Sequence, residues 1–268
     1  MVHYFYDPNL RTNTTTMHIR NFLFAISIVI ISCKQPTHIV KTQTTVYPLN
    51  KPGFTTVDST ILKSYASYKH IIDSTMNRVI IVSERNMDKK TPEGLLGNMA
   101  ADASFDELQK KYFDKSLPEY DFCFLNNGGL RASLPAGDIT VGNIFSLMPF
   151  ENEMVVLVLS GATTEKLLNF IAAKGGMPVS GLTMKIRDTL ATDILIKGKP
   201  FDSNRNYVVA TSDYLANGGD NLDFLSEAIA KYSTGFKLRD LIILNLENKN
   251  KQGQKLSAKI EGRITYVK

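Results

Sequence analysis

The sequence predicts an α+β fold, a single domain with a mixed β-sheet flanked by helices. Two observations support this prediction. Short runs rich in β-branched residues, typical of strands, are interspersed with stretches that carry apolar residues at helical spacing. The two kinds of segment do not follow a strict strand–helix–strand repeat, so the pattern favours a mixed sheet over a purely parallel one. An apolar content of 43% and a charged content of 21% are ordinary for a protein that buries a core.

The domain is expected to span residues 58–268, with short connections between its elements. The expected strands are 78–83, 121–126, 153–160, 181–187, 193–198, 206–213 and 262–268. The expected helices are 93–113, 141–148, 163–175 and 221–232. Thr91 is a candidate cap of the first helix, with Pro92 in its first turn. Leu222, Leu225 and Ile229 supply the helical spacing of the last one.

The first 57 residues differ in composition from the domain. An apolar run at 22–32, preceded by a short basic stretch that starts at Met17, stops at Cys33. The run is too short to span a bilayer and has the layout of a signal peptide. Ser32 and Cys33 resemble a bacterial lipobox, in which the cysteine is lipidated. We therefore expect a signal peptide with lipobox at 1–33, with Met17 as the start codon, and a polar tether at 34–57. The alternative is an ordinary structural or free cysteine.

Charge and cysteine content argue against two other kinds of function. The net charge is +5, but the lysines are scattered, so a solvated surface is favoured and no nucleic-acid partner is expected. Cys123 lies in the apolar run DFCFL and is expected to be a small buried hydrophobic residue rather than a nucleophile.

Three loops that follow predicted elements carry the candidate functional residues. They are Asn126–Arg131, Met148–Asn152 and Tyr214–Asp220. Each has a plain structural explanation, because glycine pairs form turns, proline ends helices and aspartate caps them. Those explanations do not account for the arginine on the first loop or for the aromatic residue on each of the other two loops. An arginine suits phosphate or vicinal hydroxyls, and two aromatic rings can hold a flat ring between their faces.

The sequence around these loops, NNGGLRASLPAGDITVGNIFSLMPFENEMVVLVLSG and later YLANGGDNLDFL, resembles the C-terminal, substrate-binding domain of the 5′-nucleotidase and UDP-sugar hydrolase family. The segment EGLLGNMAADA resembles a third family motif. The resemblance covers residues 58–268, with the motifs in the family's order, and it implies the α+β fold of that domain.

The resemblance also implies roles for individual residues. Arg131 stands at the arginine that contacts the ribose and phosphate side of the nucleotide, and Asn126 and Gly128 line the nucleoside pocket from the same loop. The family's second arginine falls here at Pro92, with Lys89 or Lys90 as possible substitutes.

Phe150 and Tyr214 stand at the two aromatic residues that enclose the base. Asp220 stands at the aspartate that accepts hydrogen bonds from ribose hydroxyls, and a helix-capping role for this carboxylate remains open.

Family members hydrolyse nucleotides with two divalent metal ions, held by D-x-H and G-N-H-[ED] motifs in a separate N-terminal metallophosphatase domain. None of the chain's histidines, His3, His18, His38 and His70, lies in such a motif. The expectation is therefore no catalytic residue, metal site or bound cofactor in this chain, and divalent metals in a partner metallophosphatase chain.

Three interpretations follow. The first is a nucleotide-binding component of a split 5′-nucleotidase, lipid-anchored in the bacterial cell envelope. The second is a nucleoside- or nucleotide-binding lipoprotein without catalysis, and the third is an interaction scaffold. Contact with the membrane is expected through the lipid anchor alone.

Overall fold

The protein is described from a computed structural model, which covers residues 59–112 and 119–267. The expected signal peptide at 1–33, with Cys33, and the expected tether at 34–57 lie outside these ranges. The helices are α2 (Ser59–Met76), α3 (Leu95–Lys111), α4 (Val141–Leu147), α5 (Gly161–Ala173), α6 (Asp213–Ala216) and α7 (Leu238–Lys251), with short 3-10 turns at Asn127–Gly129, Gly219–Asn221 and Asp223–Glu227. The strands are β1 (Val79–Ser83), β2 (Phe122–Phe124), β3 (Gly137–Thr140), β4 (Glu153–Leu159), β5 (Val179–Ser180), β6 (Leu182–Arg187), β7 (Leu190–Ile196), β8 (Lys199–Pro200), β9 (Tyr207–Ser212), β10 (Ala230–Lys237) and β11 (Ile264–Tyr266).

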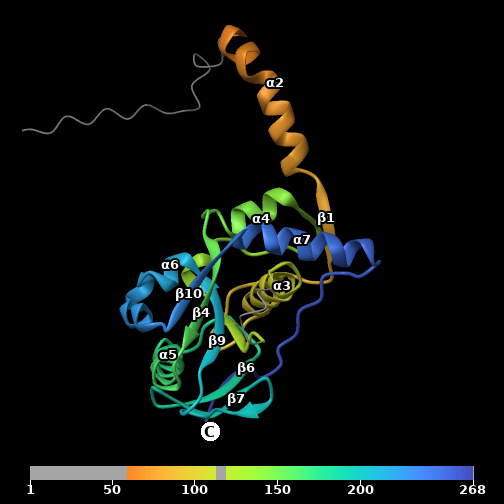
Figure 1. Cartoon of the computed structure of the whole chain (residues 1–268). Helices are drawn as coiled ribbons and strands as arrows, with labels where there is room; N and C mark the ends of the chain where they lie inside the picture. The colour runs from red at the N-terminus through yellow and green to blue at the C-terminus, as the bar shows by residue number, and fades with distance from the viewer. Residues whose placement is uncertain (1–58, 113–118, 268) are drawn as a thin grey trace, which may run out of the picture. The chain divides into compact units, whose positions relative to one another are not determined.

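A five-stranded mixed sheet with the order β10-β4-β9-β2-β5 forms the centre of the domain (Figure 1). β9 runs parallel to β2, and the other neighbouring pairs are antiparallel. Every residue of β9 is buried, as expected for a central strand covered on both faces. The predicted α+β class is confirmed.

Side chains alternate between two cores along the strands of this sheet. Cys123, Val156 and Val208 belong to one core, together with residues of α3, α4 and α7. Their neighbours Phe122 and Leu157 belong to the other core, with residues of α5, β6 and β7. The period of two places successive side chains on opposite faces, so the sheet lies between a helical layer and a layer formed by α5 and a second sheet.

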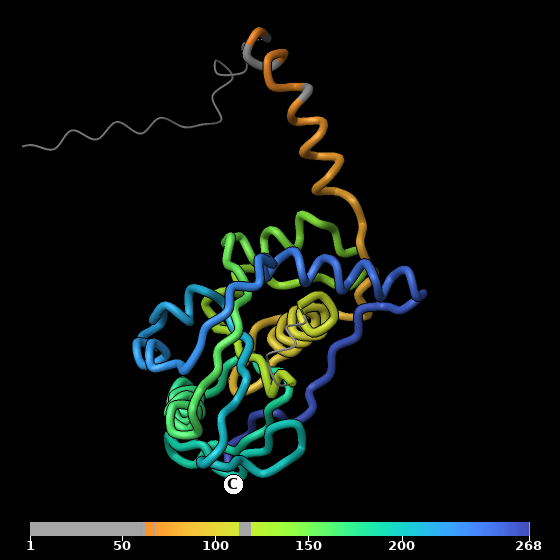
Figure 2. The backbone as a smooth tube through the Cα atoms, in the orientation of Figure 1, coloured from red at the N-terminus to blue at the C-terminus, as the bar shows by residue number. Residues whose placement is uncertain are grey.

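The second sheet has the order β11-β6-β7-β8, and β1 pairs with β3 in a third, two-stranded sheet. After α7 the chain passes α3 and ends in β11, which can be followed in Figure 2. Cys123 is buried and unbonded to another cysteine, and burial raises the pKa of its thiol. This environment agrees with a small hydrophobic role.

Three predictions about elements are wrong. The segment predicted as a helix at 221–232 forms short 3-10 turns and then enters β10, where Ala230 pairs with Val158 of β4. Hydrogen bonding to a distant strand prevails here over the local helical spacing, and Ile229 lies exposed rather than in the core. The domain begins with helix α2 instead of a strand, and α7 was not predicted.

Thr91 does not cap α3. The residue before this helix is Gly94, and no side chain there accepts a hydrogen bond from the first turn. By contrast, Thr140 caps α4 in a capping box with Asn143, and Ser160 caps α5. The Thr140 cap fixes the start of the helix that leads into the Phe150 loop.

Candidate functional site

A single cavity of about 400 Å³ brings the six predicted binding residues together. Its lining consists of Asn126, Gly128, Gly129, Arg131, Phe150, Asn152, Tyr214 and Asp220. These residues come from three loops that are far apart in the sequence, and two of the loops follow strands of the central sheet, β2 and β9. The proximity of the three loops is therefore a feature of the fold.

The first loop leaves β2 and turns at once in the 3-10 segment Asn127–Gly129. A Cβ atom on Gly129 would lie 2.8 Å from Oδ1 of Asn126, so glycine is needed here for close approach rather than for a positive φ angle. The backbone N–H of Arg131 donates to the carbonyl of Leu147 at 2.8 Å, which ties this loop to the end of α4. The Arg131 guanidinium is exposed, and its Nη1 donates to the carbonyl of Gly128 at 3.3 Å.

Asp220 joins the first loop to the third. Its Oδ2 accepts a hydrogen bond from Nδ2 of Asn126 at 2.7 Å, and its Oδ1 accepts one from the Tyr214 hydroxyl at 2.9 Å. No side chain, Asp220 included, caps the short 3-10 segments around it, so the helix-cap interpretation is wrong in the described region. A carboxylate has about four acceptor positions, so two remain for further donors such as vicinal hydroxyls.

Tyr214 lies in α6, directly after β9. The carboxylate of Asp213 accepts from the backbone N–H of Tyr214 at 2.8 Å and from that of Glu153 at 3.2 Å, which fixes α6 against β4. A Cβ atom on Gly219 would lie 2.6 Å from two ring carbons of Tyr214, so the ring packs on a position that only glycine can occupy. The bond to Asp220 raises the pKa of the Tyr214 hydroxyl, which therefore stays protonated at neutral pH.

Phe150 lies on the second loop, between α4 and β4. Its side chain is 50% exposed and that of Tyr214 is 45% exposed, although both line the cavity. Large exposed rings at a concave site are suited to stacking on a flat ligand. Asn152, two residues after Phe150, also lines the cavity and was not predicted.

Glu151, Lys237 and Arg239 support the Phe150 loop and were not predicted either. Glu151 forms ion pairs with Lys237 and with Arg239. Hydrogen bonds from these two cations hold the pKa of Glu151 at about 2, well below its usual value. Lys237 and Arg239 lie at the start of α7, a helix that the prediction lacks, so no local pattern linked them to Phe150.

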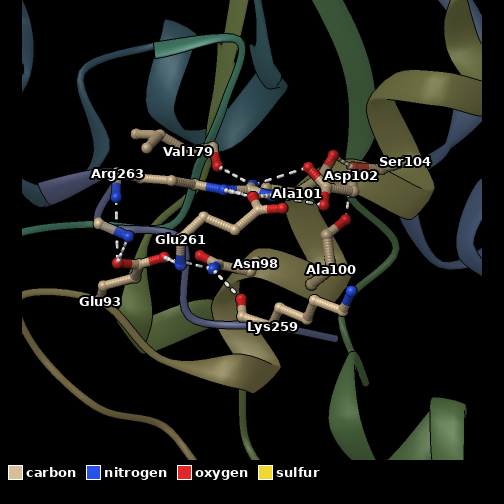
Figure 3. A network of polar contacts seen from close by, with 11 residues as sticks. Glu93, Asn98, Ala100, Ala101, Asp102, Ser104, Val179, Lys259, Glu261 and Arg263 are labelled. Atoms are coloured by element: carbon tan, nitrogen blue, oxygen red, sulfur yellow. Dashed lines mark hydrogen bonds and ion pairs between the residues drawn. The ribbon is translucent and has the colours of Figure 1, made fainter. Parts of the chain in front are cut away.

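The third motif has a structural role and does not line the cavity. Glu93 accepts hydrogen bonds from Asn98 and from the backbone N–H groups of Glu261, Gly262 and Arg263 at 2.6 to 3.0 Å (Figure 3). The Arg263 guanidinium makes two parallel bonds of 2.7 Å to the Asp102 carboxylate. The motif therefore attaches the C-terminal segment to α3.

Neither Lys89, Lys90 nor Pro92 belongs to the cavity lining found in the described ranges. Within residues 59–112 and 119–267, no group of three or more His, Cys, Asp and Glu side chains is arranged to hold a metal ion. No helix in the same ranges is both long enough and apolar enough to cross a membrane.

Comparison with solved structures assigns the fold to a class. The 5′-nucleotidase precursor from Thermus thermophilus matches with a TM-score of 0.64 and 26% identity, covering 78% of this chain and 43% of that one. The NAD nucleotidase of Haemophilus influenzae matches with a TM-score of 0.59 at 16% identity, over 78% and 41% of the two chains, which supports the fold alone. The fold and the cavity thus define a domain of the 5′-nucleotidase class.

The family model described as "5′-nucleotidase, C-terminal domain" matches residues 72–227, more than half of the chain. This protein therefore belongs to the family of 5′-nucleotidase C-terminal domains. Among curated relatives, Protein UshA of Escherichia coli is 32% identical over 124 residues, which cover 43% of this chain and 22% of that protein. The trifunctional nucleotide phosphoesterase protein YfkN of Bacillus subtilis is 29% identical over 199 residues, which cover 66% of this chain and 13% of the YfkN chain. This chain thus spans about a quarter or less of these relatives.

Proposed function

We propose that this chain is the nucleotide-binding, specificity-determining component of a 5′-nucleotidase-type phosphohydrolase that acts in nucleotide catabolism. The observation that carries the proposal is the joining of Arg131, Asp220, Phe150 and Tyr214 in one cavity. An arginine, a partly unsatisfied carboxylate and two exposed rings match the phosphate, the ribose diol and the flat base of a nucleotide.

In the proposed complex the base stacks between Phe150 and Tyr214. The ribose hydroxyls donate to the free acceptor positions of Asp220, which Asn126 and Tyr214 already hold in place. The phosphate side then lies toward the exposed guanidinium of Arg131. Because Asp220 is fixed before a ligand arrives, binding costs little side-chain ordering at this residue.

We propose that a separate metallophosphatase chain supplies the metal ions and the hydrolytic step. Two divalent ions there would activate a water molecule and neutralise the charge on the phosphate. The residues of this chain would bind the nucleoside part and orient the scissile phosphate ester. Orientation of this kind makes a large contribution to rate but does not replace the activated nucleophile.

Helix α2 provides a surface that suits such a protein partner. Tyr65, Tyr68 and Ile72 are exposed at positions i, i+3 and i+7, which lie on one face of a helix. The stripe continues into Met76, which packs against the core. Exposed apolar side chains gathered on one face are a feature of interaction surfaces. The curated relatives contain much additional chain beyond the matched region, and we propose that the separate metallophosphatase chain covers this stripe.

For the location of the protein, we propose the bacterial cell envelope, with a lipid anchor at Cys33. Support comes from the apolar run at 22–32 that ends at this cysteine. One relative, 28% identical over 71% of this chain, is named Cell wall protein Lmo0130 of Listeria monocytogenes.

Calorimetric titration of the purified chain tests the proposed ligand class. Adenosine and AMP should bind saturably, and ribose 5-phosphate should bind far more weakly because it lacks the base. A folded chain that binds neither adenosine nor AMP would refute the proposal. Binding without any gain of hydrolysis in the presence of a metallophosphatase chain would instead favour a nucleotide-binding lipoprotein without catalysis.

A further inference from the structure

We infer that Arg239 and Glu151, together with Lys237, position the ring of Phe150 for stacking on the base. The inference rests on the proposed function of the cavity and assigns a role to side chains that do not themselves line it. It starts from the second loop, residues 148–152, which has no regular secondary structure between α4 and β4. Half of the Phe150 side chain is exposed, so the backbone of the loop must fix the direction in which the ring points.

Consecutive residues at the start of α7 hold the backbone of this loop on both sides of Phe150. On the N-terminal side, Nη1 of Arg239 donates to the carbonyl of Met148 at 3.3 Å. On the C-terminal side, the backbone N–H of Leu238 donates to the carbonyl of Asn152 at 2.9 Å. Phe150 and Asn152, which both line the cavity, therefore have their backbone positions set by one short segment.

The side chain next to Phe150 is held by the same segment. Glu151 binds Lys237 through one carboxylate oxygen and Arg239 through the other. A carboxylate held at both oxygens restricts rotation of the loop about Glu151. The Phe150 ring thus has less conformational freedom, although it does not contact Lys237 or Arg239 directly.

Arg239 places a buried charge beside this loop. Its side chain is 5% exposed, its guanidinium carbon lies 3.9 Å from the centre of the Phe145 ring in α4, and its buried Nε has no hydrogen-bond partner among the described residues. Burial of a charge is costly, and an apolar side chain could pack against Phe145 instead. The hydrogen bonds that Arg239 does make go to Met148 and Glu151, which lie on either side of Phe150.

A double-mutant cycle on adenosine affinity tests this inference. Glu151→Gln keeps the shape of an exposed side chain but removes its charge, and should weaken binding by about three- to tenfold, as expected for the loss of a charge-assisted contact. In a Phe150→Ala background the same change should have no further effect on affinity, because there is no ring left to position. Glu227→Gln, which breaks the exposed pair with Lys166, is the matched control and should bind as the wild type does.

Arg239→Lys adds a second test, because it keeps the charge but loses the planar fork and the stack on Phe145. It should also weaken binding only when Phe150 is present. Equal losses with and without Phe150, or wild-type affinity in Glu151→Gln, would overturn the inference. If the wild-type chain binds no adenosine at all, the proposed function fails and the positioning role fails with it. If Phe150→Ala weakens binding and Glu151→Gln does not, the positioning role alone is wrong.

Discussion

Asp220 is the residue whose carboxylate links the first and third loops of the cavity by hydrogen bonds. Its backbone has a φ of 57°, in the left-handed region that Asn and Asp tolerate better than most residues. This conformation lies within the turn that follows Gly218 and Gly219, and the carboxylate bonds to Asn126 and Tyr214. Both the backbone and the two neighbours therefore fix the position of the remaining acceptor sites.

Asp220→Asn should lower the affinity for adenosine by about tenfold or more, because charge-assisted hydrogen bonds to the ribose are lost. Asparagine tolerates the same backbone conformation, so the fold should persist. The affinity for 2′,3′-dideoxyadenosine, which lacks both hydroxyls, should not change. Calorimetry with the two ligands measures this, and an equal loss for both would show that Asp220 does not contact the ribose.

Tyr214→Ala should weaken adenosine binding by roughly tenfold, because stacking of one ring on a base contributes about 1–3 kcal/mol. Tyr214→Phe keeps the ring, loses only the bond to Asp220 and should have a smaller effect. Tyr266→Ala removes an exposed tyrosine from β11, outside the cavity lining, and serves as the control. Unchanged affinity in folded Tyr214→Ala would rule out stacking on this ring.

At the scale of elements, the sequence predicts those strands and helices whose local pattern agrees with their surroundings. β4 and β9 are long apolar runs in the centre of the sheet, and the boundaries of β9 differ from the prediction by one residue at each end. The helix prediction for 221–232 is wrong because 3-10 turns bury Leu222 and Leu225 without a helix. The residues that follow form β10, which pairs with β4. Local spacing contains no information about that distant strand.

The missed helix α7 is a different case. Leu238, Leu241, Ile242, Asn245 and Leu246 are buried with helical spacing, so the signal is present in the sequence. The polar, lysine-containing second half of the helix obscures this signal.

The main motif residues of the cavity could be identified by resemblance, whereas Glu151, Lys237 and Arg239 could not. Their contact depends on how β10 and α7 pack beside the Phe150 loop.

The ion pairs of Glu151 lead to a prediction about pH. The folded pKa of about 2 lies below the usual value of about 4.3, so the ionised carboxylate stabilises the fold above pH 4.3 and loses this effect as the pH falls toward 2. The difference in melting temperature between wild type and Glu151→Gln should be constant from pH 8 to pH 5. It should shrink below about pH 4 as the wild-type carboxylate takes up a proton. Calorimetric melts across this range test the prediction, and a difference that grows on acidification would contradict it.

The surface of α2 gives the second prediction at this scale. Replacing Tyr68 and Ile72 together by serine should reduce the activity gained with a metallophosphatase chain and leave adenosine affinity unchanged, because the cavity lies elsewhere. Ile260→Ser is the control, since Ile260 is as exposed as Ile72, at 57%, and lies outside α2. If the two variants behave alike, the Tyr65–Tyr68–Ile72 stripe is not the contact surface.

At the scale of the whole molecule, we propose that attachment, nucleotide binding and hydrolysis depend on separate parts: the lipid anchor, this domain and a second chain. Attachment is proposed to depend on Cys33, so Cys33→Ser should move the protein from the membrane fraction to the soluble fraction of cells. A lipid chain, rather than a spanning helix, would then have been the anchor. Salt-washed membranes that still retain the variant would show that the anchor is something else.

The central claim is that this chain orients the nucleotide while another chain hydrolyses it. The most direct test is phosphate release from AMP with a divalent metal, measured for the purified chain alone and after mixing with a separately purified metallophosphatase chain. We predict no release above background from the chain alone and a clear gain on mixing, most of which Arg131→Ala should abolish because the guanidinium on the phosphate side is lost. Metal-dependent hydrolysis by the chain alone, abolished by Arg131→Ala and hence not due to a contaminant, would show that this chain itself hydrolyses the nucleotide and would contradict the claim.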